Sequence, residues 1–159
     1  MASVSITPDQ DLIVAEIEIA APPERVFQAI TDPRQLPQWW GQKEMYRVTR
    51  LESDLRVGGQ WLSVGVSVTG ESFHVGGEYL EIDPPRLLVQ TWKASWSGTL
   101  KTTVRWELEA YPGGTRVKIR HSGFAGNAEA ANSHSQGWQR VLAWVHAFLE
   151  RGETIDSRS

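Results

Sequence analysis

The sequence contains no cysteine, which excludes disulfide bonds, thiolate metal sites and a cysteine nucleophile. It also has no apolar run approaching the roughly 20 residues that a membrane-spanning helix needs. The first residues lack the basic stretch and the apolar run of an export signal. From these absences we expect a soluble, cytoplasmic protein. Its 159 residues suit one domain, because a chain of this size buries about 70% of its unfolded surface on folding.

No segment of the chain concentrates charges of a single sign. The 16 basic and 19 acidic residues are interspersed and give a net charge of −3. The sequence therefore lacks the basic stripe that nucleic-acid binding requires, and we expect no nucleic-acid partner. Closely spaced histidines, a nucleophile turn around a serine and a phosphate-binding loop are also missing. We accordingly predict no metal site, no cofactor and no recognisable catalytic residue.

Tryptophan, by contrast, is abundant, with eight residues. Its side chain is large, and its N–H group needs a partner when it is buried. Eight tryptophans in a small domain indicate either a wide interior walled by aromatic rings or a bulky core. Composition does not distinguish these two interpretations.

Alternating polar and apolar residues predict a sheet of six or seven strands. In the first strand Ile13, Ala15 and Ile17 face one side, and Glu16 and Glu18 face the other. The predicted strands cover residues 12–19, 46–54, 60–68, 73–82, 87–96, 100–110 and 115–121. Short connections favour antiparallel pairing between them. The pattern leaves open whether Trp61 and Trp92 face inward or outward.

Helices are predicted after the first strand and at the C-terminal end. The proline pair at 22–23 suits the start of a short helix, and Asp32-Pro33 ends it and leads into a second one. Residues 133–150 predict a long helix, because apolar residues from Trp138 onward recur at helical spacing. Arg140, Ala143 and Ala147 are expected on the opposite side of that helix. Residues 64–72 and 123–132 are rich in small residues, and we expect them to form mobile lids.

Several short motifs share one order along the chain. They are residues 19–27, Thr31-Asp32-Pro33, Trp39-Trp40, residues 77–87, Thr91-Trp92, residues 121–124 and Gly137-Trp138. In this order and spacing they resemble the activator of heat-shock-protein-90 ATPase homologue family, within the START/Bet v 1-like (SRPBCC) superfamily. The resemblance runs from about residue 12 to residue 151, which we treat as one domain with terminal extensions at 1–11 and 152–159.

The resemblance implies an α+β helix-grip fold. In that fold a curved antiparallel sheet wraps a long C-terminal helix, two short helices follow the first strand, and a cavity remains between sheet and helix. Members of the superfamily bind lipids, hormones and aromatic polyketides, and a few are cyclases or hydrolases. The co-chaperones that name the family use such a domain to contact their chaperone. The fold by itself does not fix the function.

The candidate site follows from the expected geometry. A strongly curved sheet and a straight helix cannot touch everywhere, so we expect a gap lined by aromatic residues. The candidate ligand-binding residues are Trp61, His74, Trp92, Trp106, His121, His134, Trp138 and Leu142, and the cavity-mouth residues are Trp39, Trp40 and Phe124. A histidine in such a pocket can hydrogen-bond a ligand or act as a general base. Core packing or an ordinary structural hydrogen bond is the alternative role for each of these residues.

Three functional hypotheses follow. The first is binding of a small, largely hydrophobic or aromatic molecule in the cavity. The second is a co-chaperone-like module that contacts a chaperone through the outer face of the sheet, although Arg105, Glu107 and Arg116 give that face mixed charge without aromatic anchors. The third is a cyclase or hydrolase that acts on a hydrophobic substrate in the same cavity. All three hypotheses leave open whether the protein forms a homodimer.

Overall fold

The strands with the strictest alternation form the floor of the sheet. These are β2 (Leu12–Ile19), β8 (Thr102–Tyr111) and β9 (Gly114–Ser122), whose apolar residues are buried on one face. The structure is a computed structural model that describes residues 2–158. Its other strands are β1 (Ser3–Ile6), β3 (Gly41–Gln42), β4 (Tyr46–Ser53), β5 (Gln60–Ser67), β6 (Ser72–Asp83) and β7 (Leu87–Ala94). All neighbouring strands are antiparallel, in the order β1-β2-β9-β8-β7-β6-β5-β4-β3.

The α+β helix-grip prediction is confirmed, but the predicted count of six or seven strands is too low. The structure has nine strands in one sheet. The two additional strands are β1, with four residues, and β3, with two. Segments this short contain too little alternation for a periodic pattern to reveal them.

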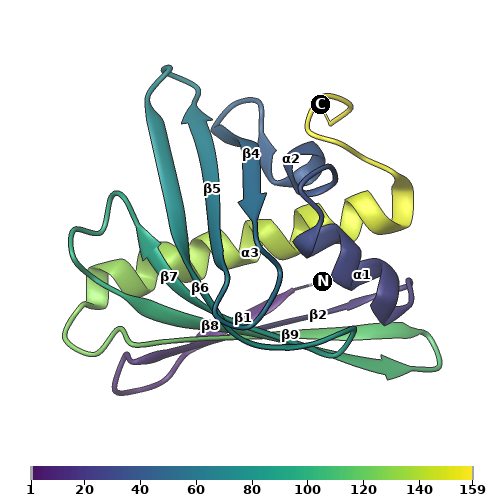
Figure 1. Ribbon diagram of the computed structural model, residues 1–159, viewed down its shortest axis with the longest axis horizontal. Helices are drawn as coiled ribbons and strands as arrows, with labels where there is room; N and C mark the ends of the chain where they lie inside the picture. The colour runs from purple at the N-terminus through teal and green to yellow at the C-terminus, as the bar shows by residue number, and fades with distance from the viewer. Residues whose placement is uncertain (1, 159) are drawn as a thin grey trace.

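The sheet bends so that its two halves meet the long helix differently (Figure 1). β2, β8 and β9 run along that helix, whereas β4, β5 and β6 rise across it. Register shifts occur in β4 between Val48 and Arg50, and in β6 between Tyr79 and Glu81. Bulges of this kind increase local twist and bend the bulged strand. The raised half of the sheet therefore stands away from the helix.

Three helices cover the concave face. They are α1 (Pro23–Thr31), α2 (Leu36–Trp39) and α3 (Ala128–Arg151). Pro23 stands at the first position of α1, which buries Val26, Phe27 and Ile30 as its pattern predicts. In α3 the predicted apolar stripe is buried at Trp138, Val141, Leu142, Val145 and Phe148. Within residues 2–158, no helix combines the length and apolar character that crossing a membrane demands.

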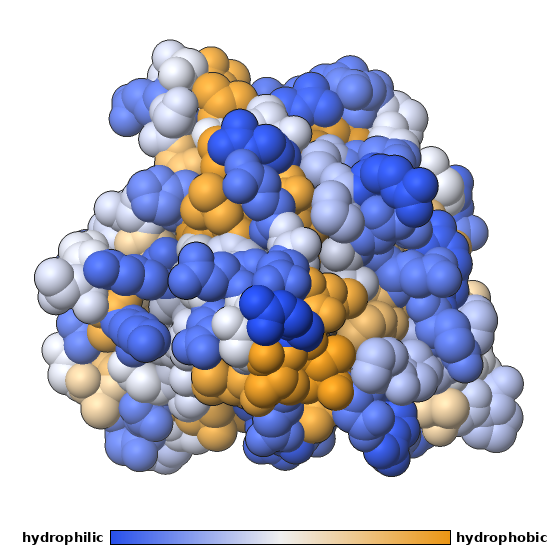
Figure 2. All heavy atoms as spheres, in the orientation of Figure 1, coloured by the Kyte–Doolittle hydropathy of each residue, from blue (hydrophilic) through white to orange (hydrophobic). Residues whose placement is uncertain are grey.

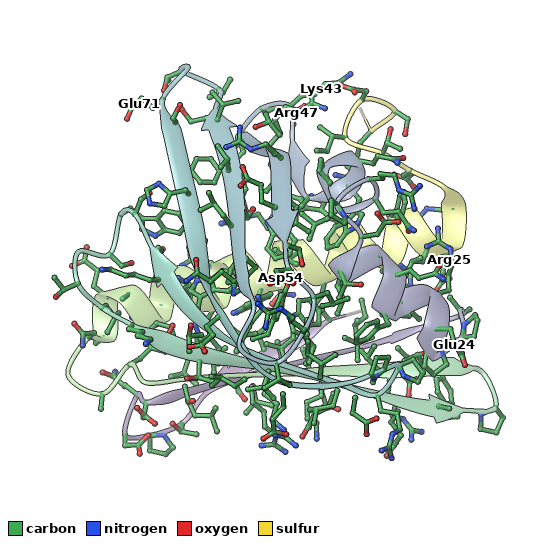
Figure 3. All side chains as sticks on the ribbon, viewed as in Figure 1. Glu24, Arg25, Lys43, Arg47, Asp54 and Glu71 are labelled. Atoms are coloured by element: carbon green, nitrogen blue, oxygen red, sulfur yellow. The ribbon has the colours of Figure 1, made fainter. Side chains whose placement is uncertain are left out.

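The chain folds back after α3. Gly152, in the left-handed conformation with φ 67°, ends the helix, and its N–H donates to the Phe148 carbonyl. Ile155 is fully buried and its N–H donates to the Gln38 carbonyl at 2.8 Å. Asp156 pairs with Arg47 of β4 at 3.0 Å, at the end of the molecule where Figure 3 labels Arg47.

The described parts of the predicted terminal extensions, residues 2–11 of 1–11 and 152–158 of 152–159, thus contribute packed structure. Residues 3–6 form the edge strand β1 against β2, and Ile155 belongs to the buried residues. Residues 1 and 159 lie outside the described part of the chain. The domain limits of 12–151 leave out both of these packed segments.

The two predicted lids are largely regular structure. Residues 64–67 continue β5, and only 68–71 form the turn to β6, whose tip carries Glu71 (Figure 3). Likewise α3 begins at Ala128, so its preceding loop is shorter than the predicted 123–132. Valines alternate with small residues in β5, and this fits a strand despite the many small side chains.

Candidate functional site

A cavity of about 360 Å³ lies between the raised half of the sheet and α3. Nine of the residues that line it are aromatic, namely Trp40, Tyr46, Trp61, Phe73, Tyr79, Trp92, Trp96, Trp106 and Trp138. Its polar groups are few, namely Ser63, Ser67, Gln90, Ser133, His134 and Arg140. A concave, largely apolar space with a small number of polar groups is typical of small-molecule sites.

Small residues on both walls leave this space open. On β5 the inward positions after Trp61 are Ser63, Gly65 and Ser67, and the Phe73 ring occupies the room above Gly65. On α3, Gly137 lines the cavity, and a Cβ atom added there would meet no other atom within 4 Å. A glycine inside a helix costs about 1 kcal/mol relative to alanine. The chain accepts this cost at a position where a side chain would enter the cavity.

Five tryptophans pack into one cluster at the base of the cavity. The Trp92 ring lies at its centre, 5.3 Å from the Trp61 ring and 5.4 Å from the Trp138 ring. Trp106 meets Trp138 edge to face at 5.5 Å, and Trp40 does so at 6.0 Å. Offset and edge-to-face contacts of this type are favourable for aromatic rings. The cluster fixes the inward direction of Trp61 and Trp92, which the sequence pattern left open.

His121 is fully buried behind this cluster. Its Nδ1 accepts a hydrogen bond from the Trp138 indole N–H at 2.9 Å, and its Nε2 lies 2.6 Å from the Thr102 hydroxyl. An indole N–H is only a donor, so Nδ1 carries no proton and Nε2–H donates to Thr102. The Thr102 hydroxyl then donates onward to the Trp92 carbonyl at 3.1 Å. Both ring nitrogens of His121 are therefore already used.

His134 repeats this arrangement at the cavity wall. Its Nε2 accepts from the Trp92 indole N–H at 3.3 Å, and its Nδ1–H donates to the Ala130 carbonyl at 2.9 Å. Burial lowers the pKa of His134, against the opposing effect of the Ala130 carbonyl. Burial lowers the pKa of His121 well below its ordinary value, and the repulsion between the two protonated imidazoles lowers it further. Both histidines are neutral at pH 7 and neither presents a free nitrogen to the cavity.

The structure brings most of the predicted ligand-binding residues together. Trp61, Trp92, Trp106, His134 and Trp138 line the cavity, and their roles in binding remain predictions. His121 and Leu142 are fully buried but do not line it.

His74 is the residue that the structure separates from the others. It is exposed, its backbone N–H donates to the Ser95 hydroxyl, and its side chain is absent from the cavity wall. Its neighbours Phe73 and Val75 both face the cavity. Successive side chains of a strand point to opposite faces, so His74 must point outward. The structure thus contradicts the placement of His74 in the cavity.

The predicted mouth residues require a correction. Trp40 lines the cavity, but Trp39 is fully buried and its indole N–H donates to the Ala29 carbonyl at 2.9 Å. Phe124 is also fully buried, with its ring 4.6 Å from that of His121. By contrast, Trp96 lines the cavity, is 54% exposed and stacks on His134 at 6.0 Å, so this residue extends from the cavity wall to the surface.

Trp96, Tyr46 and Arg140 are among the residues of the cavity wall that sequence reasoning missed. Trp96 and Tyr46 lie at the ends of predicted strands, where parity is hard to assign. Arg140 was expected on the far side of the last helix, yet it lines the cavity, and its Nε atom is buried without a hydrogen-bond partner. The spacing of Ser133, Gly137 and Arg140 at i, i+4 and i+7 was the available signal. Among residues 2–158, no group of three or more His, Asp or Glu side chains is arranged to hold a metal ion.

Comparison with known proteins gives one family and many related folds. Residues 20–150 match the family model described as Activator of Hsp90 ATPase homolog 1-like protein. The crystal structure of protein CV1439 from Chromobacterium violaceum is 28% identical, with a TM-score of 0.78 over 88% of this chain and 97% of that chain. Two further structures share the fold. A crystal structure from Rhodobacter sphaeroides is 20% identical, with a TM-score of 0.80 over 93% of this chain and 97% of that chain. The solution structure of an AHSA1-like protein from Aeromonas hydrophila is 22% identical, with a TM-score of 0.73 over 89% of this chain and 93% of that chain. The chain matches no curated protein.

Proposed function

Because the chain belongs to the family of Activator of Hsp90 ATPase homolog 1-like proteins and encloses an aromatic cavity, we propose that it binds a small, largely hydrophobic or aromatic molecule there. The observation that carries this proposal is the space itself. Protein interiors are normally close-packed, since an unfilled void forfeits dispersion contacts. A cavity kept open by Ser63, Ser67 and Gly137, with the half-exposed Trp96 in its wall, is suited to receive a ligand.

The wall chemistry indicates the class of ligand. Tryptophan faces offer a planar apolar body large contact area, and few polar groups are present to solvate a sugar or a nucleotide. A lipid chain or a planar polycyclic compound fits this description. Gln90 and the serines provide places for one or two polar substituents.

Native mass spectrometry of the purified protein tests the proposal. We expect a non-covalent adduct whose mass disappears on denaturation, and the released compound should be apolar. The proposal fails if no adduct is found and if, in addition, lipid and aromatic compounds leave the thermal unfolding temperature unchanged.

A chaperone-binding role is the second candidate, and one surface feature favours it. The outward positions of β5 are Leu62, Val64 and Val66, followed by Val68 with 64% of its surface exposed. Figure 2 shows hydrophobic surface along this part of the sheet. Titration of purified Hsp90 with the wild type and with Val66→Lys tests this role, and equal binding of both variants would count against the β5 surface.

The cyclase or hydrolase alternative gains no support from the two buried histidines. A general base needs a free nitrogen within reach of the substrate. The nitrogens of His121 and His134 are bonded to Trp138, Thr102, Trp92 and the Ala130 carbonyl.

A further inference from the structure

We propose that Arg140, assisted by the Tyr46 hydroxyl, binds an anionic oxygen group on the ligand, either a carboxylate or a phosphate. This inference rests on the proposed function, because it names the charge that the cavity's ligand carries. The natural ligand would then be an amphiphile: an apolar body among the tryptophans and one negatively charged end beside α3.

Arg140 stands apart from the other arginines of the chain. Nine of them hold a carboxylate within salt-bridge distance. Arg25 donates to the Gln35 side chain, and Arg158 donates to the Gly41 carbonyl through Nη1, although its Nε and Nη2 are also buried without a partner. The side chain of Arg140, which is partly exposed as a whole, forms no hydrogen bond and no ion pair with the residues in 2–158, and its Nε is buried without a partner. A guanidinium keeps its proton in proteins, so the charge of Arg140 is permanent.

The cavity supplies no acidic partner for this charge. None of the side chains that line it within residues 2–158 is an aspartate or a glutamate. A buried donor without an acceptor destabilises the fold, and more so when it is charged. An acceptor that arrives with the ligand removes this cost. Carboxylate and phosphate groups suit the planar fork of a guanidinium, which donates two parallel N–H bonds.

A second donor lies at the same end of the cavity. Tyr46 lines the wall, and the ring packs edge to face on Trp144 at 5.8 Å, one turn of α3 beyond Arg140. Its hydroxyl accepts a hydrogen bond from the Trp40 indole, which can only donate, so the hydroxyl proton itself has no acceptor among the described residues. Burial raises the pKa of the Tyr46 hydroxyl, against the opposing effects of the Trp40 side chain and the nearby Arg140 charge. The hydroxyl therefore keeps its proton and is available to donate it to an anion.

Three probes of similar shape test this proposal: 1-naphthylacetic acid, 1-naphthyl phosphate and the neutral 1-naphthylacetamide. Isothermal titration calorimetry gives the Kd of each for the wild type, Arg140→Gln and Arg151→Gln. We expect at least one anionic probe to bind the wild type about tenfold or more tightly than the amide. Arg140→Gln should abolish this preference and leave the amide affinity within about twofold. Arg151→Gln removes the same charge from the exposed end of the same helix and should change nothing.

A stability readout separates a binding role from a structural one. Without ligand, Arg140→Gln should unfold at the same urea concentration as the wild type or a higher one, because it removes a buried N–H group that has no acceptor. Arg140→Lys keeps the charge without the planar fork, so its preference for the anion should be intermediate. Tyr46→Phe should weaken only the anionic probes.

The outcomes distinguish this inference from the proposed function. Tighter binding of 1-naphthylacetic acid than of 1-naphthyl phosphate would identify a carboxylate ligand. Tighter binding of the phosphate would identify a phosphate ligand. Equal binding of acid, phosphate and amide, or an anion preference that survives in Arg140→Gln, would overturn the role of Arg140 while the binding function stands. Failure of all three probes to bind the wild type would count against the binding function itself.

Discussion

The indole N–H of Trp138 donates to Nδ1 of His121 at 2.9 Å, and this contact joins α3 to β9 in the middle of the core. It fixes the protonation state of the imidazole, since an indole can only donate. The same logic holds between Trp92 and His134. The two histidines, which resemble candidate acid–base residues, are thus hydrogen-bonded to tryptophans and support the cavity wall.

Removal of the Thr102 hydroxyl should destabilise the fold. In Thr102→Val the Nε2–H of His121 loses its acceptor in a fully buried site. We expect the free energy of unfolding to fall by about 1–3 kcal/mol, measured by urea denaturation. Thr103→Val, on the outward side of the same strand, is the matched control and should change it by less than about 0.5 kcal/mol. Equal effects of the two changes would contradict the hydrogen-bond network.

Stability should depend on pH through the two buried histidines. Their pKa values are lowered in the folded protein, so below about pH 6.5 the unfolded chain binds more protons than the folded chain. The stabilisation is complete above that pH and is lost as the pH falls toward the folded-state pKa values. Each histidine contributes a slope of up to about 1.4 kcal/mol per pH unit.

Urea denaturation between pH 7.5 and pH 5.5 measures this slope. The His121→Asn variant has no imidazole at this position and should lose its share of the slope. A free energy of unfolding that stays constant across this range in the wild type would show that the histidines are not held neutral.

Two tryptophans should respond in opposite ways to truncation. Trp39 is fully buried and bonded to Ala29, so Trp39→Ala should cost about 3–5 kcal/mol of stability. Trp96 is half exposed at the cavity mouth, so Trp96→Ala should cost less than about 1 kcal/mol and weaken ligand binding instead. Thermal unfolding and a ligand titration on both variants give the comparison. If Trp96→Ala binds the ligand as tightly as the wild type does, Trp96 does not contribute to binding at the cavity mouth.

Much of the fold could be predicted from the sequence because its central elements have one wet face and one buried face. Alternation in β2, β8 and β9 and the helical stripe of α3 report burial directly. The prediction for Ala147 was wrong, because this residue is buried on the side expected to face water. The chain folds back at this end of the helix, where the N–H groups of Gly152 and Glu153 both approach the Ala147 carbonyl, and no periodic pattern shows such a tail.

The cavity was harder to predict than the core. On β5 the inward residues are small and the outward ones are valines, which inverts the usual signal of a half-buried strand. The position of Arg140 is a second exception, because a charged residue beside an apolar stripe normally indicates a solvated face. Residues that keep a space open, or that await a ligand, break the local rules by which a core is recognised.

The most direct test of the binding cavity is a substitution that fills it with a side chain. Gly137→Phe places a ring in space where a Cβ meets no atom, and Gly137→Ala is its control for helix propensity. Native mass spectrometry of the wild type and both variants, prepared in parallel, should detect a bound compound in the wild type and Gly137→Ala and none in a folded Gly137→Phe. Equal retention of the compound by Gly137→Phe, or its absence from all three proteins, would contradict a ligand site between β5 and α3.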